Sequence, residues 1–247
     1  MLTVSRAWGR LVPHLYQPHF FRYTSRDSLM KHHLALLVLA AGIVPGASAQ
    51  SHPGPIEAVT IHPPITASFQ CSEHALGAED HVGDALGSDC VVVRRDGGPD
   101  GQFLSFYTGD GTRNEDWHSW NEPLLAPFDG VVTLIYINPE TTVPGVWGEG
   151  RSSAVLFKRI GGDEDAPPLQ VGYVHVQDVL VAEGDTVTAG QPVARIGNNG
   201  SSWHPHVHVG AFRGELYSDD AVALQVRMDL EALGRLRGTW ASPQEEQ

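Results

Sequence analysis

Short apolar runs separated by glycine-containing turns fill most of the sequence after residue 90, and they restrict the fold more than any other feature. The runs that predict β-strands cover residues 91–94, 130–137, 154–159, 170–176, 186–187, 192–196, 206–212 and 224–229. Pairs such as Asp129-Gly130 and Gly161-Gly162 mark the corners between runs. A helical period is sustained only over residues 229–236. The sequence therefore predicts an all-β domain over residues 90–240.

A single long apolar run lies near the beginning, at residues 34–44. It is too short to span a bilayer as a helix. Small residues, Ala-Ser-Ala, end at position 49 and suit cleavage by a signal peptidase. We therefore predict a signal peptide over residues 30–49, with residues 1–29 a misassigned N-terminal extension and the protein periplasmic or secreted. After cleavage we expect no membrane span. An uncleaved membrane anchor is the alternative.

Residues 50–89 carry a weak pattern of scattered Pro, Gly and His, and they predict an extended leader. Cys71 in this leader and Cys90 are the two cysteines of the chain, too few for a four-cysteine zinc site. Export would place both thiols in an oxidising compartment, which favours a Cys71–Cys90 disulfide. Two buried free thiols are the alternative.

The formal net charge is −13, and the sequence contains no basic run. Proteins that bind nucleic acids need a basic patch or stripe to neutralise phosphates. We therefore expect no nucleic-acid partner. Nothing in the sequence indicates the oligomeric state.

Histidines occur in two of the predicted strands, and one of these strands carries two of them at alternating positions. Side chains alternate between the faces of a β-strand, so His206 and His208 project to one face. His175 follows Tyr173 by two residues, and we expect these two to share a face in the same way. Neutral imidazole is a common metal ligand, and two of them on one face can share an ion and its water. Exposed polar positions on a solvated face are the alternative for each histidine alone.

The residues between and around these strands resemble a known family. Tyr-x-His at 173–175 is followed by V-x-x-G-D-x-V-x-x-G-Q and G-N-x-G over 181–200, and then by P-H-x-H at 205–208. Upstream, residues 123–132 read P-L-L-A-P-F-D-G-V-V. This combination is similar to that of the M23 zinc metallopeptidases, the lysostaphin type. The resemblance covers roughly residues 90–213 and implies an antiparallel β-sheet groove or sandwich that holds one Zn²⁺.

The resemblance also implies roles for individual residues. His208 would be a metal ligand, and His175 and His206 would be catalytic histidines beside the bound water. The carboxylate ligand of the family precedes the P-x-x-A-P strand, where Asp116 is the best match. The family pattern H-x-x-x-D has a histidine four residues earlier, but Thr112 stands there.

The third ligand is therefore open. His118 is the first candidate because it would share a strand face with Asp116. The other nearby candidates are Asp110, Asn114 and Glu115. A catalytic zinc normally keeps three protein ligands and one open position. If only Asp116 and His208 remain, metal binding would be weak or absent.

Three functions follow from these observations. The first is an exported zinc endopeptidase that cleaves peptide cross-links of bacterial cell-wall peptidoglycan through a metal-activated water. The second is a non-catalytic M23-like domain that binds the wall or regulates a partner hydrolase. The third is a biotinyl- or lipoyl-carrier domain, whose hairpins resemble residues 181–191. A carrier needs a lysine at a hairpin tip, but Lys158, the only lysine after residue 49, falls within a predicted strand.

Overall fold

The computed structural model describes residues 55–79, 81–96, 101, 103–162 and 166–239. The chain divides into two units, Met1–Gly46 and Ala47–Gln247, and all described residues belong to the second. The predicted signal peptide and the extension before it lie outside the described residues. Within the described part, no helix combines the length and the apolar character that crossing a membrane requires.

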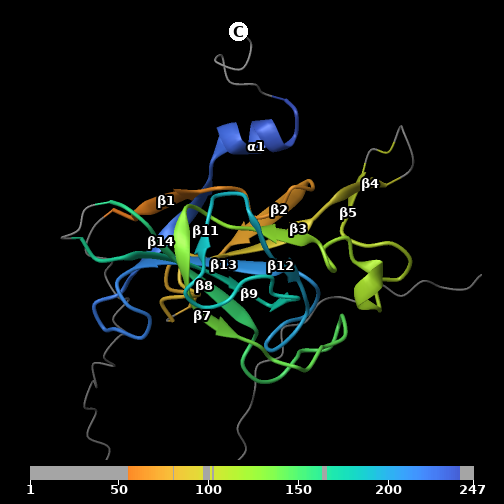
Figure 1. Ribbon diagram of the computed structural model, residues 1–247. Helices are drawn as coiled ribbons and strands as arrows, with labels where there is room; N and C mark the ends of the chain where they lie inside the picture. Colours follow the sequence, from red (N-terminus) through yellow and green to blue (C-terminus); the bar gives the residue numbers. More distant parts are fainter. Residues whose placement is uncertain (1–54, 80, 97–100, 102, 163–165, 240–247) are drawn as a thin grey trace, which may run out of the picture. The chain divides into compact units, whose positions relative to one another are not determined.

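Strands make up almost all of the regular structure (Figure 1). The first seven are β1 (Ala58–Ile61), β2 (Phe69–Glu73), β3 (Ser88–Val92), β4 (Arg94–Asp96), β5 (Phe103–Ser105), β6 (Pro123–Leu125) and β7 (Gly130–Tyr136). The remaining strands are β8 (Ala154–Arg159), β9 (Leu169–Val174), β10 (Val176–Gln177), β11 (Thr186–Val187), β12 (Pro192–Ile196), β13 (Val207–Arg213) and β14 (Val222–Met228). Among the residues that the structure describes, the helical elements are a 3-10 turn, η2 (Asn114–Asp116), and one α-helix, α1 (Leu230–Leu236).

The strands form one large sheet and two small ones. The large sheet has the order β1-β14-β13-β9-β8-β7-β11, and β3 pairs with both β13 and β2. All of its pairs are antiparallel except β1 with β14. A three-stranded sheet has the order β10-β12-β6, and β4 and β5 form a hairpin. The predicted all-β class is confirmed.

The hydrophobic core lies between the large sheet and the β10-β12-β6 sheet. Alternate residues of β8 and β9, among them Phe157 and Tyr173, are fully buried in this core. Leu124 and Ile196 contribute from the small sheet. The hydroxyl of Tyr173 donates a hydrogen bond of 2.9 Å to the backbone carbonyl of Leu125, which ties the two sheets together. The residues that alternate with these on β8 and β9 face away from this core.

The segment expected to be an extended leader, residues 50–89, contributes two strands to the sheet. β1 lies parallel to β14, and β2 pairs with β3 so that Cys71 stands directly opposite Cys90. The predicted disulfide between these cysteines is present, with both in the described part of the chain. Cys90 is also the register partner of Val207, the first residue of β13. The disulfide thus holds β2 against the strand that borders the histidine-bearing β13.

Candidate metal site and groove

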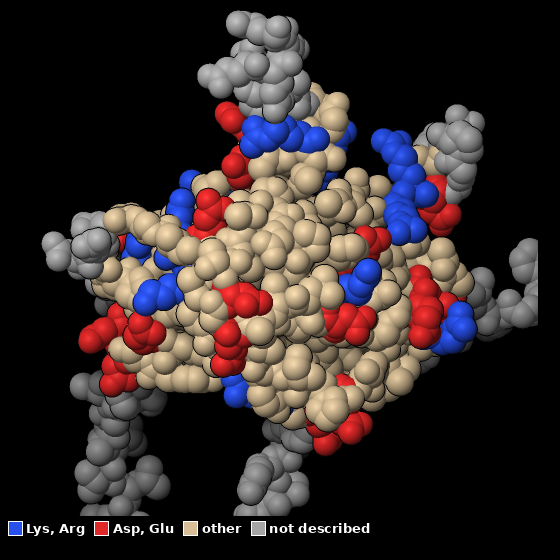
Figure 2. All heavy atoms as spheres, viewed as in Figure 1, with Lys and Arg blue, Asp and Glu red and all other residues tan. Residues whose placement is uncertain are grey.

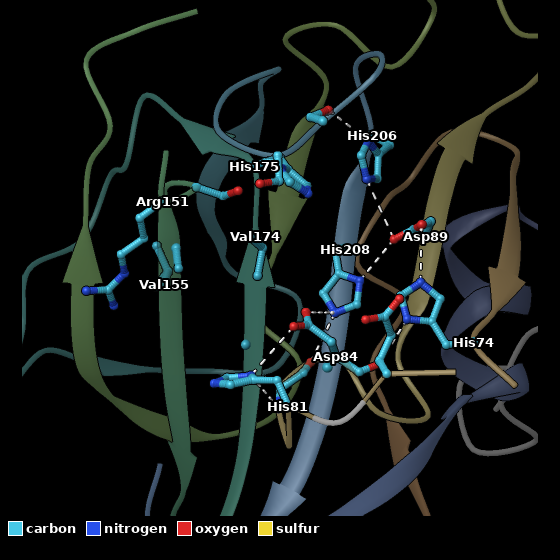
Figure 3. A pocket seen from close by; sticks show the side chains of 18 of the residues that line it. His74, His81, Asp84, Asp89, Arg151, Val155, Val174, His175, His206 and His208 are labelled. Atoms are coloured by element: carbon cyan, nitrogen blue, oxygen red, sulfur yellow. Dashed lines mark hydrogen bonds and ion pairs between the residues drawn. The ribbon is translucent and has the colours of Figure 1, made fainter. Parts of the chain in front are cut away.

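A groove with a cavity volume of about 850 Å³ runs along one face of the large sheet (Figure 3). Its floor is formed by residues that alternate with core residues along β8, β9 and β13. These floor residues are Ala154, Leu156, Gly172, Val174, His208 and Gly210. The remaining histidines of the groove are His74, His81, His175, His204 and His206. Six imidazoles thus converge on one apolar floor.

His208 and Asp89 stand side by side because their strands pair. β13 and β3 are antiparallel neighbours, and the register places His208 opposite Asp89. His208 Nδ1 lies 2.9 Å from Asp89 Oδ1. The other ring nitrogen, Nε2, donates to the backbone carbonyl of Gly83 at 3.0 Å. Carbonyl and carboxylate oxygens only accept, so both ring nitrogens of His208 carry protons in these two bonds, and Nδ1 would lose its proton on binding a metal.

His74, from the loop after β2, completes this cluster. Its Nε2 lies 3.3 Å from Asp89 Oδ2, while its Nδ1 donates to the backbone carbonyl of Asp84 at 2.9 Å. One ligand atom each from His74, Asp89 and His208 lies within 4.8 Å of the others. Two imidazole nitrogens and one carboxylate oxygen are ligands that zinc takes, and three of them leave its fourth position open. The donor set therefore fits a catalytic zinc.

The cluster perturbs the pKa values of Asp89 and His208. Burial alone would raise the pKa of Asp89, but the hydrogen bond from His208 and the nearby His206 hold that pKa far below its usual range. Burial alone would lower the pKa of His208, but its hydrogen bonds with Asp89 and the Gly83 carbonyl raise it. Asp89 is thus a carboxylate at neutral pH, as metal ligation requires.

His175 and His206 stand together beside the cluster, with ring centroids 4.4 Å apart. Burial, followed by the neighbouring His206, lowers the pKa of His175 to about 3, and burial lowers that of His206 to about 4. Each ring donates its Nδ1 proton to a backbone carbonyl at 2.8 Å, His175 to Asn199 and His206 to His204. Both rings are therefore neutral at neutral pH and carry no proton on Nε2, and Nε2 of His206 lies 3.6 Å from Asp89 Oδ1.

The orientation of His175 differs from the expectation that it shares a face with Tyr173. Tyr173 is buried in the core, whereas Val174 pairs with His208 on the groove side. His175 still reaches the groove because its φ of +64° ends β9 and turns its side chain back toward Val174's face. Left-handed backbone is uncommon for residues other than glycine and recurs where function requires a particular side-chain direction. The simple alternation argument was wrong at this position.

Comparison with protein families supplies the last observation. The sequence model described as peptidase family M23 matches residues 118–219, which include His175, His206 and His208. This segment is similar to peptidase family M23. The M23 segment begins after His74 and Asp89, so these two residues enter the site on geometry alone. The predicted resemblance is confirmed.

Several solved structures of peptidases are similar to this chain at low identity. A zinc-containing peptidase from Vibrio cholerae is 15% identical, with a TM-score of 0.39, over 68% of this chain and 40% of its own. A peptidase M23 structure from Pseudomonas aeruginosa is 16% identical, with a TM-score of 0.36, over 76% of this chain and 55% of its own. This chain thus matches about half or less of either protein.

The catalytic domain of lysostaphin from Staphylococcus simulans is 15% identical, with a TM-score of 0.33, over 69% of this chain and 86% of that domain. None of the curated proteins compared with this chain matches it. The predicted antiparallel β-sheet with a groove along one face is present.

Asp116 and His118 lie apart from the histidine cluster of the M23 groove. Asp116 ends the η2 turn, where its carboxylate accepts hydrogen bonds from the Arg113 guanidinium at 2.8 Å and the Arg113 backbone at 3.1 Å. These bonds lower its pKa. His118 lines a separate small pocket with Arg94 and Tyr107. Their assignment as metal ligands stays a prediction, and the structure brings His74 and Asp89 to His208 instead.

Sequence reasoning missed His74, Asp84 and Asp89. Their segment was predicted to be an extended leader, and it carries no motif of the H-x-x-x-D type at Asp89. One signal was available: Asp89 immediately precedes Cys90 and a run of valines, and it lies two residues before the predicted strand at 91–94. An acidic residue beside a disulfide cysteine, entering an apolar run, indicates a carboxylate held at the edge of the core.

Proposed function

We propose that this protein is an exported, zinc-dependent M23 endopeptidase that cleaves the peptide cross-links of bacterial peptidoglycan. One observation carries the proposal. The groove holds a His74–Asp89–His208 donor set beside two neutral imidazoles, His175 and His206, whose free nitrogens are acceptors. Metal ligands and proton acceptors in one groove are the two requirements of metal-assisted peptide hydrolysis.

His208 through Nδ1, His74 through Nε2 and Asp89 through its carboxylate would hold the zinc. When bound, zinc supplies Lewis acidity that polarises a peptide carbonyl and makes water more acidic. Backbone carbonyls fix the tautomers of His74 and His208, which is the usual role of groups that orient metal-bound imidazoles. Zinc binding by these three residues would not require Asp116 or His118.

His175 and His206 would carry the protons. The attacking water loses a proton to Nε2 of one imidazole as its oxygen bonds to the peptide carbon. The same Nε2–H then donates the proton to the amine nitrogen as the C–N bond breaks. The second imidazole holds the substrate or its developing oxyanion by a hydrogen bond. Low pKa values keep both rings unprotonated before the reaction.

The peptidoglycan substrate and the site of action rest on family membership and on the predicted signal peptide. Peptidase family M23 supplies the class of reaction. A formal net charge of −13 gives no general attraction to an anionic wall polymer. Substrate recognition would therefore depend on contacts inside the groove.

The ligand set is tested by metal analysis of the purified full chain after dialysis. We expect about one zinc per chain in the wild type, because the cluster supplies three ligands. His208→Ala and Asp89→Asn should lose it, while the matched variants Asp116→Asn and His118→Gln retain it. Loss of zinc in Asp116→Asn with retention in Asp89→Asn would reverse the assignment and restore the ligands expected from sequence.

Catalysis is tested by digestion of isolated peptidoglycan, with released fragments measured by mass spectrometry. We expect wild-type protein to release peptides and a chelator to stop the release. Stoichiometric zinc without cleavage of any wall preparation would contradict the hydrolase proposal and favour the non-catalytic M23-like domain that binds the wall or regulates a partner.

A further inference from the structure

The groove lining includes Arg151 and two exposed tryptophans, Trp147 and Trp203. Trp147 and Trp203 are 50% and 52% exposed and meet edge to face, with ring centroids 5.3 Å apart. Arg151, at the entrance to β8, lines the same groove. We call Trp147, Arg151 and Trp203 the rim. Figure 3 shows Arg151 across the floor from His208 and Asp89, with Val155 and Val174 between them.

The two loops that carry the rim are fastened to each other. The backbone amide of Gly145 donates to the Trp203 carbonyl at 2.9 Å, and that of Gly148 donates to the Ser202 carbonyl at 3.0 Å. A Cβ on Gly148 would lie 2.1 Å from the Gly200 carbonyl oxygen, so the loops approach as closely as glycine allows. The rim is therefore a preformed surface that needs little ordering when a ligand binds.

Arg151 is placed to bind a ligand carboxylate. Its guanidinium packs over the Tyr136 ring, 4.2 Å from the centroid, which orients the side chain. Among the described residues it has no carboxylate within ion-pair distance. It is also the only Lys or Arg among the described residues that line the groove. The guanidinium is therefore available to pair with the carboxylate of a ligand.

The opposite end of the groove has the opposite charge. Its lining includes Glu79, Asp84 and Asp89, the last of these in the metal cluster. Between the two ends the floor is apolar, formed by residues such as Leu156 and Val174. The groove is therefore polarised along its length, with its acidic groups near the metal cluster and its cation at the rim.

We propose that the rim is a subsite for an acidic residue of the substrate peptide, with Arg151 as the residue that determines specificity. The carboxylate pairs with the Arg151 guanidinium, whose fork matches its two oxygens. The aliphatic part of the same residue packs on Trp147 and Trp203. This inference rests on the proposed peptidase function and adds the class of substrate, a peptide with an acidic residue on the rim side of the cleaved bond.

The test uses the full chain and peptides that differ only by Glu or Gln at each position around the cleaved bond. For at least one position we expect the wild type to favour Glu in kcat/KM by about tenfold, as a charge-assisted pair on a partly exposed site predicts. Arg151→Gln should remove this preference. Arg151→Glu should favour a Lys peptide instead.

Arg159→Gln is the matched control, because Arg159 also packs over an aromatic ring, that of Phe128, but lies outside the groove lining. It should keep the Glu preference of the wild type. Unchanged melting temperatures would show that all variants are folded. A wild type without preference for Glu, or a preference that survives Arg151→Gln, would overturn the inference while leaving the hydrolase proposal intact.

A second readout separates the two proposals if no peptide is cleaved. Fluorescein-labelled Glu and Gln peptides are titrated with wild type, Arg151→Gln and Arg159→Gln, and binding is measured by anisotropy. Tighter binding of the Glu peptide that only Arg151→Gln abolishes would support the subsite although hydrolysis failed. Equal binding of both peptides to wild-type protein would overturn it.

Discussion

Four histidines around Asp89 each commit one ring nitrogen to a backbone carbonyl. These bonds run from His74, His175 and His206 through Nδ1 and from His208 through Nε2. The accepting carbonyls are those of Asp84, Asn199, His204 and Gly83. A carbonyl that accepts one ring proton leaves the other nitrogen as an acceptor in a neutral ring. The main chain thus decides which nitrogen of each histidine is available for a metal or a proton.

Replacing one of the two proton-carrying histidines should separate metal binding from catalysis. We expect His206→Gln and His175→Gln to lower kcat on isolated peptidoglycan or a cleaved peptide by a factor of about 10² to 10⁴, the usual contribution of a general base. Zinc content should stay near that of the wild type because neither ring belongs to the donor set. His62→Gln is the control, since His62 lies outside the groove lining and should leave both quantities unchanged.

At the scale of single residues, sequence reasoning worked where backbone geometry is regular. His206 and His208 were expected to share a face, and both line the groove. His175 was predicted to be in the site for a reason that fails, because a positive φ, which alternation does not foresee, sets its direction. Asp89 was missed because its role depends on the pairing of β3 with β13. This pairing brings Asp89 beside His208, which lies 119 residues later in the chain.

At the scale of elements, β3 is the strand that completes the site. It lies between β2 and β13 and is fixed to β2 by the Cys71–Cys90 disulfide. Asp89 precedes Cys90 directly, so this covalent link lies next to the carboxylate of the donor set. The disulfide should therefore affect both the stability of the fold and the retention of metal.

Removal of the disulfide tests this connection. The double variant Cys71→Ser/Cys90→Ser should lower the free energy of unfolding by about 3 kcal/mol, the chain-entropy estimate for a loop of this size. Urea titration followed by circular dichroism measures this change. Metal affinity, measured by competition with a chelator, should fall as well because β3 is less firmly held. Unchanged metal affinity despite lower stability would show that strand pairing alone positions Asp89.

The elements themselves were largely readable from sequence. The predicted strands at 154–159, 186–187 and 192–196 have the bounds of β8, β11 and β12, because turns with Gly or Pro delimit them. β1 and β2 were not predicted. Their sequences lie among scattered Pro and His. The partner of β1 is β14, which is remote in the chain, and the partner of β2 is β3, which follows a long loop. Strands of this kind are specified by their neighbours more than by their own pattern.

At the scale of the whole molecule, charge opposes binding to an anionic polymer. Figure 2 shows Asp and Glu side chains scattered over the visible face, with Lys and Arg between them and no large basic patch. With a formal net charge of −13, long-range repulsion from wall polymer should slow association. The proposed pairing of Arg151 with a carboxylate would then be a local attraction on a protein that otherwise repels anionic ligands.

Ionic strength should reveal this repulsion. Raising it from about 20 to about 150 mM shortens the Debye length to roughly 8 Å, so release of fragments from isolated peptidoglycan should become a few times faster. Cleavage of a short uncharged peptide should change little over the same range. A rate on peptidoglycan that falls steadily with salt would instead indicate attraction between wall and protein.

β13 is bonded along both of its edges. β9 pairs with it on one side, and β3 and β14 pair with its two ends on the other. The amides of this strand can exchange with deuterated solvent only when neighbouring strands separate, which is close to complete unfolding. His208 lies in this strand and His206 directly precedes it. Motion of the surrounding loops should therefore leave the backbone positions of these two histidines, and the proton transfers proposed for the groove, largely unchanged.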